Sequence, residues 1–218
     1  FKDPNVEQFV ERFETESREV FALRNEIVAA CELKPGETIA DIGAGTGLFT
    51  RLFAKEVGTD GLVIAVDIAQ KFLDHIDSTC REDKIGNVET RLCTADSVEL
   101  QPESIDVAFI CDTYHHFEFP IKTMTSLYKA LRPGGRVIII DFRRIPGVST
   151  EWTMGHVRAG QEVFESEIVE SGFQKQSERA DLLEENYFVV FTRSGKGGLS
   201  ELQYPIIAGY GGAAKVAD

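Results

Sequence analysis

Residues 41–47 read DIGAGTG and follow directly on a short apolar run. Asp41 closes that run, and three glycines, Gly43, Gly45 and Gly47, follow at every second position. Because glycine has no Cβ atom, a turn built from these residues can be tight, and its backbone can approach a ligand closely. A strand, a glycine-rich turn and a helix bind nucleotide-like ligands at the carboxyl edge of parallel sheets. The segment therefore predicts such a ligand at the end of the first strand of an α/β fold.

Outward from this turn, short apolar segments alternate with segments of helical periodicity. Strands that are apolar throughout and are separated by helices indicate a parallel sheet buried on both faces. Right-handed crossovers then give a doubly wound α/β fold. The expected strands are residues 38–42, 62–66, 88–92, 106–111, 136–140, 174–181 and 186–192. The expected helices are residues 6–13, 17–31, 48–57, 70–81, 121–131 and 161–171, and residues 142–160 are expected to be irregular.

The composition is that of a globular protein with a strongly acidic surface. Apolar residues make up 43% and charged residues 27% of the chain, and the net charge is −13. Such a charge opposes binding to nucleic acid and to anionic membrane surfaces. No stretch approaches the roughly 20 apolar residues of a membrane-spanning helix. We therefore expect a small-molecule partner, no nucleic acid and no membrane, and the sequence leaves the oligomeric state open.

The four cysteines, Cys31, Cys80, Cys93 and Cys111, are dispersed along the chain. Their spacing fits neither a zinc-ligand pattern nor a disulfide framework, so we expect free thiols. This cysteine usage fits a reducing compartment, and we expect a cytoplasmic location. Because the sequence begins with Phe1 rather than Met, the expectation applies to the residues given.

The acid before the glycines selects among nucleotide-like ligands. A dinucleotide turn has GxGxxG spacing and holds a pyrophosphate, whereas the spacing here is GxGxG and Asp41 would repel a pyrophosphate. Two opposite unit charges about 4 Å apart attract by about 4 kcal/mol at an effective dielectric of 20, so the same carboxylate favours a cation. S-adenosylmethionine carries a sulfonium and an ammonium group but no phosphate. Asp67 and Asp96, after the second and third strands, can accept hydrogen bonds from the ribose and the adenine amino group, although Asp96 could instead only cap a helix.

These motifs make the sequence resemble the class I S-adenosylmethionine-dependent methyltransferases over about residues 30–192. The resemblance rests on DIGAGTG (41–47), AVDI (65–68), TADS (94–97), DVAFICDTYHHF (106–117) and LRPGGRVIIIDF (131–142). It implies S-adenosylmethionine as the cofactor. It also implies a Rossmann-like, mostly parallel sheet of seven strands, in which a final antiparallel strand, residues 186–192, lies beside the fifth.

The resemblance further implies cofactor-binding roles for residues that follow the first four strands. Those expected around the methionine moiety are Asp41, Gly43, Ala44, Gly45, Thr46 and Gly47, with Asp112 near the methyl group. Those expected around the adenosine are Asp67 at the ribose, Ile68 on the adenine ring, and Asp96 with Ser97 at the adenine amino group.

Three regions follow from this assignment. Residues 1–33 are expected to form helices that cover the cofactor pocket, residues 34–193 the S-adenosylmethionine-binding methyltransferase domain, and residues 194–218 a linker or tail rich in glycine. Arg18 is placed to close the pocket, although it could equally pair with Glu14 on an exposed helix face.

In the family, the methyl acceptor binds at the carboxyl ends of the fourth and fifth strands, where this sequence reads CDTYHHF and DFRRIPG. Methyl transfer needs a general base only where the acceptor carries a proton that must leave. A neutral histidine suits that task near pH 7. His115 or His116 is the expected base, with His156 second, and Asp141 is the fourth expected catalytic residue. The alternative for each histidine is a purely structural role.

No metal site is expected at this edge. Asp112, His116, Asp141 and His156 could gather as ligands, and some relatives hold a catechol-like substrate with a divalent ion. However, these residues form no ligand motif such as HExxH.

The expected function is methyl transfer from S-adenosylmethionine to a small molecule, at an oxygen, nitrogen, sulfur or activated carbon atom (EC 2.1.1.-). The alternatives are a non-methyl-transfer enzyme on the same fold and a non-catalytic cofactor-binding module. Asp41 disfavours a nicotinamide oxidoreductase. Arsenite is disfavoured as the acceptor because relatives that act on it carry clustered cysteines.

Overall fold

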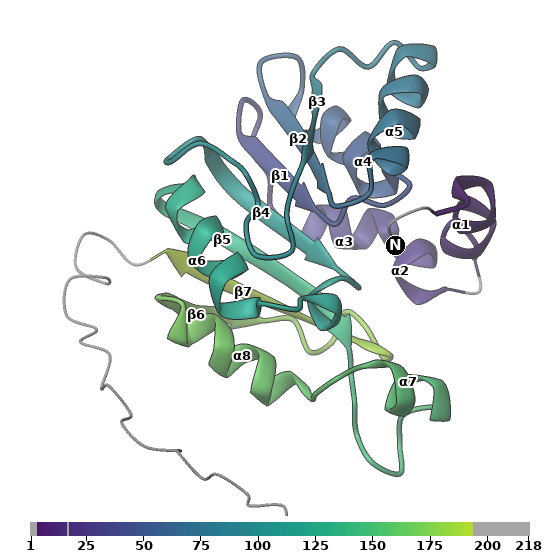
Figure 1. Cartoon of the computed structure of the whole chain (residues 1–218), viewed down its shortest axis with the longest axis vertical. Helices are drawn as coiled ribbons and strands as arrows, with labels where there is room; N and C mark the ends of the chain where they lie inside the picture. The colour runs from purple at the N-terminus through teal and green to yellow at the C-terminus, as the bar shows by residue number, and fades with distance from the viewer. Residues whose placement is uncertain (1–3, 17, 194–218) are drawn as a thin grey trace, which may run out of the picture.

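The computed structural model describes residues 4–16 and 18–193, so the expected linker or tail, residues 194–218, lies outside the described residues. A seven-stranded sheet runs through the middle of the described part (Figure 1). Its strand order is β3-β2-β1-β4-β5-β7-β6. The strands are β1 (Thr38–Ile42), β2 (Leu62–Asp67), β3 (Val88–Leu92), β4 (Ile105–Cys111), β5 (Leu131–Phe142), β6 (Phe173–Glu178) and β7 (Asn186–Arg193).

The first five strands pair in parallel, and the last two are antiparallel to their neighbours. β1 pairs with β2 and β4, β2 with β3, and β4 with β5, all in parallel. β7 is antiparallel to both β5 and β6. The predicted doubly wound, mostly parallel sheet with an antiparallel strand beside the fifth is thus confirmed. The strand order reverses between β1 and β4, and in such sheets ligands bind outside the carboxyl ends of the strands at that point.

Helices cover both faces of the sheet. They are α1 (Val6–Phe13), α2 (Glu19–Ala22), α3 (Arg24–Ala30), α4 (Leu48–Val57), α5 (Gln70–Glu82), α6 (Pro120–Ala130), α7 (Glu151–His156) and α8 (Gln161–Glu170), with the 3-10 helix η1 (Tyr114–His116). The α3 and α4 side chains share one apolar cluster with alternate strand residues, including Val107 and Phe109. The α6 and α8 side chains share the other cluster, with Ala108 and Ile110. These four β4 residues are fully buried, which explains why the strand is apolar without alternation.

Several predicted elements differ from the observed ones. β5 begins at Leu131, where Leu131 pairs with Ile105 of β4, whereas the sequence predicted a helix up to residue 131 and a strand only over residues 136–140. The helix predicted over residues 17–31 is two helices, α2 and α3, because Leu23 between them has φ −100° and ψ 22°, outside the helical range. The segment predicted to be irregular, residues 142–160, contains α7, and the side chain of Thr150 caps that helix. The strand predicted over residues 174–181 ends earlier, at Glu178, because the chain then turns towards β7.

The described helices are short, and the longest, α5, has 13 residues. Among the described residues, none of the helices combines the length and the apolar character needed to cross a bilayer. Three of them, α1, α2 and α7, lie on the same side of the sheet, near the carboxyl ends of β4 and β5 (Figure 1). This is the edge at which the sequence predicts both the cofactor and the acceptor.

Candidate active site

The glycine turn between β1 and α4 has a left-handed backbone at all three glycines. Gly43, Gly45 and Gly47 have φ values of +74°, +54° and +76°. A Cβ atom on Gly43 would lie 2.3 Å from Cγ2 of Thr113, and one on Gly47 would lie 2.7 Å from Cγ1 of Ile76. A Cβ atom on Gly45 would meet no atom closer than 3.9 Å. Two of the glycines are therefore required by neighbouring side chains, and the third leaves the surface of the turn open to a ligand.

Two buried acids flank this turn. The Thr50 hydroxyl donates to Oδ2 of Asp41 at 2.6 Å, and burial raises the pKa of Asp41 from 3.8 to about 7. Asp67 accepts from the backbone N–H groups of Gly45, at 3.0 Å, and Ala69, at 2.8 Å. Burial also raises the pKa of Asp67, and its charge in turn raises that of Asp41. A cationic ligand at this turn would relieve the cost of burying both carboxylates.

The other residues expected near the cofactor lie around the same edge. Ile68, next to Asp67, exposes 51% of its surface, which is unusual for a large apolar side chain beside a sheet. Asp96 is exposed after β3 and lies 3.5 Å from Nζ of Lys122. Ser97 accepts from the N–H of Glu99 at 3.3 Å. Within the turn, the N–H of Ala44 donates to the Val66 carbonyl at 3.1 Å, and the carbonyl of buried Thr46 accepts from Arg51 at 2.9 Å.

A pocket of about 720 Å³ opens at the carboxyl ends of β4 and β5, and we call it the edge pocket. Its walls come mainly from α1, from η1, from the segment between β5 and α7, and from α7 itself. All three expected catalytic histidines line it, as does Asp112. Its apolar lining residues are Phe9, Phe13, Phe142, Ile145, Val148 and Trp152.

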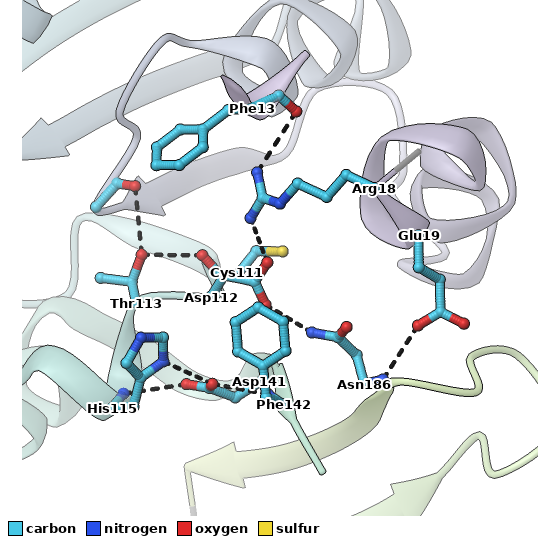
Figure 2. Close-up of polar contacts among 11 residues, drawn as sticks. Phe13, Arg18, Glu19, Cys111, Asp112, Thr113, His115, Asp141, Phe142 and Asn186 are labelled. Carbon is cyan, nitrogen blue, oxygen red and sulfur yellow. Dashed lines mark hydrogen bonds and ion pairs between the residues drawn. The ribbon is translucent and has the colours of Figure 1, made fainter. Parts of the chain in front are cut away.

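One side of the edge pocket is held by an ion pair between distant parts of the chain (Figure 2). Arg18 donates to Oδ2 of Asp112, and Asn186 donates to Oδ1 of Asp112 at 2.6 Å. The predicted alternative partner of Arg18, Glu14, instead pairs with Arg51 at 3.1 Å. Burial raises the pKa of Asp112 to about 6, and Arg18 opposes that rise. Asp112, expected beside the cofactor's methyl group, thus lies in the wall of the edge pocket and is bonded on both oxygens.

The helix after Arg18 is fixed to the same edge of the sheet, where β5 ends and β7 begins. The Glu19 carboxylate accepts from the backbone N–H groups of Glu185 and Asn186, both at 3.0 Å. The start of α2 is therefore bound to the start of β7, on the side from which Asn186 reaches Asp112 (Figure 2). These contacts place Arg18 at the edge pocket, whose described lining includes no residue of the glycine turn, so closure of the cofactor pocket by Arg18 stays a prediction.

His115 and Asp141 form a buried pair at the ends of neighbouring strands β4 and β5 (Figure 2). Nδ1 of His115 lies 2.7 Å from Oδ1 of Asp141, and the backbone N–H of His115 donates to Oδ2 at 3.0 Å. Since a carboxylate accepts and does not donate, Nδ1 carries the proton and the lone pair of the neutral ring is on Nε2. Nε2 is buried and has no hydrogen-bond partner among the described residues.

The three histidines expected from the sequence lie together. The ring centroids of His115 and His116 are 4.0 Å apart, and His156 lies 5.1 Å and 5.0 Å from them. Trp152 stacks on His156 at 4.4 Å. Partial burial and the two neighbouring imidazoles lower the pKa of His116 to about 4, and burial and the nearby His115 lower that of His156. His116 and His156 are therefore largely uncharged near neutral pH.

The sequence predicts that the N-terminal helices cover the cofactor pocket. It does not identify the aromatic side chains of α1 or the close approach of Thr113 to Gly43 as parts of the site. Phe9 on α1 packs edge-on against Phe72 of α5 at 5.3 Å, and Phe13 lines the edge pocket. None of the α1 residues is buried, although its apolar residues are spaced for one helix face. An apolar stripe on a short, exposed helix is the signal that could have identified these side chains as part of the site.

The sequence is similar to a family of methyltransferase domains and to curated methyltransferases. Residues 33–187 match the family described as "Methyltransferase domain". A ubiquinone/menaquinone biosynthesis C-methyltransferase, UbiE, of Hydrogenovibrio crunogenus is 28% identical over 114 residues, which cover 52% of this chain and 45% of that protein. An arsenite methyltransferase of Halobacterium salinarum is 34% identical over 113 residues, covering 52% and 29% respectively. The chain thus spans less than half the length of these curated relatives.

Among solved structures, a SAM-dependent methyltransferase from Aquifex aeolicus has the same fold. Its TM-score is 0.75 at 19% sequence identity, and the match covers 88% of this chain and 100% of that one. At this identity the likeness concerns the fold alone. It agrees with the strand order and with the position of the antiparallel strand described above.

Proposed function

The chain belongs to the class I S-adenosylmethionine-dependent methyltransferases, and on that premise we propose that it methylates a phenol-like small molecule bound in the edge pocket. The observation that carries this proposal is the His115–Asp141 pair. It presents a buried imidazole nitrogen, which has no hydrogen-bond partner in residues 4–16 and 18–193, at a pocket with six large apolar side chains in its lining. The other candidate base on η1, His116, is the weaker choice because its lowered pKa, about 4, makes it a poorer proton acceptor.

The residues of the glycine turn fit S-adenosylmethionine. Asp41 is buried beside Thr50, and a carboxylate in such a place favours a positively charged ligand. Gly45 leaves the turn open, and the exposed Ile68 offers an apolar surface next to Asp67 for an adenine ring. When bound, S-adenosylmethionine supplies an electrophilic methyl group on a sulfonium.

The chain's own groups would act on the acceptor. Nε2 of His115 takes the proton of the acceptor's hydroxyl group, while Asp141 keeps Nδ1 protonated and stabilises the imidazolium that forms. The acceptor's electron pair forms the new bond to the methyl carbon, and the electron pair of the broken C–S bond stays on sulfur. The pocket walls orient the acceptor and exclude water, and alignment of this kind can contribute about 7–11 kcal/mol to catalysis.

The lining of the edge pocket favours an aromatic acceptor. Phe142 and Trp152 lie edge-to-face with their centroids 5.4 Å apart, and Phe13 lines the pocket from α1. The UbiE relative is by name a C-methyltransferase of quinone biosynthesis, which agrees with a phenol or hydroquinone methylated at a ring carbon. The arsenite methyltransferase relative suggests another acceptor. However, none of the described pocket-lining residues is a cysteine, the ligand that a soft arsenic(III) centre prefers.

The affinity for S-adenosylmethionine is expected to rise with pH. The raised pKa of Asp41 means that the free protein holds a proton there up to about pH 7. A bound cation favours the carboxylate, so binding releases that proton, and the affinity should be about tenfold weaker at pH 6 than at pH 8. Isothermal titration in buffers of different ionisation enthalpy measures both the affinity and the proton release.

The pH dependence of the free energy of unfolding provides an independent measurement of the raised pKa of Asp41. Because the folded protein holds the Asp41 proton more tightly than the unfolded chain, the free energy of unfolding without ligand should fall as the pH rises from about 4 to about 7. An Asp41→Asn variant, which has no proton to lose, should release no proton on binding and should lose the Asp41 part of the folding dependence. Asp67 and Asp112, whose pKa values are also raised, should keep their own parts. A ligand affinity that is constant across this range in the wild-type protein would contradict the assigned role of Asp41.

The proposed function is tested by binding and turnover. S-adenosylmethionine and NAD are titrated by calorimetry, and formation of S-adenosylhomocysteine is then followed with a panel of phenols, hydroquinones, thiols, amines and arsenite. We expect binding of S-adenosylmethionine, no binding of NAD, and turnover with a phenol or hydroquinone. Binding without turnover on any acceptor would favour a non-catalytic module, and binding of NAD alone would overturn the assignment.

A further inference from the structure

We propose that His115, His116 and His156 bind one divalent transition-metal ion of the zinc class, with an open coordination position towards the edge pocket. The proposal rests on the proposed function and deepens it, because the ion would hold and activate the acceptor's oxygen. A general base requires one imidazole, and the fold brings three to the same place.

The spacing of the three rings is close to that of a coordination site. One nitrogen atom from each histidine lies within 4.8 Å of the corresponding atoms of the other two. In a tetrahedral site with Zn–N bonds of about 2.0–2.1 Å, the nitrogen atoms are about 3.4 Å apart. The rings therefore need to close by at most about 1.4 Å. The outer two histidines are exposed and can make that adjustment by side-chain rotation, while His115 stays fixed.

His115 is already oriented as a metal ligand. Its Nδ1 is held at 2.7 Å by Asp141, and its Nε2 is buried without a partner in the described part of the chain. Ligating histidines commonly donate their second nitrogen to a carboxylate, which fixes the ring and makes it a better donor. A buried nitrogen without a partner is costly, and an ion would satisfy it. Asp141 itself is completely buried and would act from behind His115, not on the ion.

The donor set selects the kind of ion. Three imidazoles without a thiolate or a carboxylate suit Zn²⁺, Co²⁺, Ni²⁺ or Cu²⁺ and disfavour Mg²⁺ and Ca²⁺, which prefer oxygen ligands. One carboxylate in the pocket wall, that of Asp112, is bonded to Arg18 and Asn186 and so is not available. Trp152 stacks on His156, and Phe142 lies edge-on to His115 at 5.8 Å, so the cluster has an apolar surround. Three protein ligands with one open position is the arrangement of catalytic zinc sites.

An ion at this place would change how the acceptor loses its proton. Bound in the open position, the acceptor's hydroxyl oxygen becomes more acidic and releases its proton to solvent. Nε2 of His115 is then a ligand to the ion and no longer a base. In the ion-free protein the same nitrogen atom accepts the proton directly.

The test is a Co²⁺ titration of the full chain, freed of any affinity tag and treated with EDTA. We expect one equivalent of Co²⁺ to give the visible absorption of a four-coordinate ion, and Zn²⁺ to displace it. His116→Ala and His156→Ala should each weaken Co²⁺ binding by at least about 100-fold, and Asp141→Asn by about 10–100-fold. His75→Ala, which removes a histidine from α5, is the matched control and should bind Co²⁺ as the wild type does.

Titration of each variant with S-adenosylmethionine separates this proposal from the proposed function. Unchanged cofactor affinity together with loss of Co²⁺ binding supports the ion site and shows that the variants fold. Wild-type protein that binds S-adenosylmethionine but no Co²⁺, or whose Co²⁺ spectrum survives both histidine substitutions, overturns the ion site and leaves the proposed function intact. Loss of cofactor binding in the wild type would instead contradict the proposed function.

Discussion

A Gly43→Ala variant is expected to bind S-adenosylmethionine at least about 100-fold more weakly than the wild type. The added Cβ atom would lie 2.3 Å, 2.6 Å and 2.9 Å from Cγ2, Oγ1 and Cβ of Thr113, which is hard overlap with every atom of that side chain. Thr113 cannot easily withdraw, because its hydroxyl donates to the Cys111 carbonyl at 2.9 Å and its backbone leads into η1. Relief of the overlap must therefore move the turn, the end of β4, or both, and these carry the proposed cofactor and acceptor sites.

The effect of the clash can be separated from that of the backbone conformation. Gly43 has φ +74°, and Gly36, in the turn before β1, has φ +86° with no atom within 4 Å of the position that a Cβ atom would take. A non-glycine residue in the left-handed conformation costs roughly 1–2 kcal/mol, so Gly36→Ala should lose that stability and keep its ligand affinity. Calorimetric titration and thermal unfolding of both variants measure the two quantities.

A second substitution at the contact provides a further check. Thr113→Ala removes the atoms at 2.3 Å and 2.6 Å and leaves the one at 2.9 Å, so the double variant Gly43→Ala/Thr113→Ala should regain part of the lost affinity. If Gly43→Ala alone bound S-adenosylmethionine as tightly as the wild type, the turn would not be the cofactor site that we infer.

The parts of this molecule that follow from local sequence were predictable. The central strands of the parallel sheet are apolar along most of their length, because both faces are covered, and each is followed by a turn or a helix. The His115–Asp141 pair was also accessible to prediction. Both residues lie at the ends of neighbouring strands β4 and β5, in which Cys111 pairs with Ile140, so parallel register brings the two strand ends together.

Contacts that join distant segments could not be predicted. Arg18 and Asp112 are 94 residues apart, and nothing in the sequence around either residue indicates that they pair. The same is true of Glu19 on α2, which binds the start of β7. The glycine turn was also only partly predictable. Its sequence shows that three residues lack a Cβ atom, but only the fold shows that Thr113 and Ile76 occupy the space beside two of them. The three-histidine cluster has no sequence motif for the same reason, since one of its members comes from α7, far along the chain from the adjacent pair on η1.

Replacement of His115 by Gln in EDTA-treated protein is expected to lower kcat by about 10²–10⁴-fold for an acceptor phenol, because the group that accepts the proton is lost. The affinity for S-adenosylmethionine should not change, since His115 lies in the edge pocket and not at the glycine turn. Asp141→Asn should also lower kcat, because the amide no longer offers two acceptor oxygens to His115 and so does not hold Nδ1 in its protonated form. His75→Gln removes an imidazole elsewhere and is the control.

The acidity of the acceptor distinguishes a base from a residue that only shapes the pocket. An acceptor phenol with electron-withdrawing groups is already ionised at pH 8 and needs no base, so His115→Gln should slow its methylation far less than that of the unsubstituted phenol. A pocket defect would slow both acceptors equally. An equal loss of methylation rate for the two phenols would therefore assign His115 a positioning role and leave proton removal to another group. A loss confined to the less acidic phenol would show that the proton goes to Nε2 of His115. That atom is buried and has no hydrogen-bond partner among the described residues.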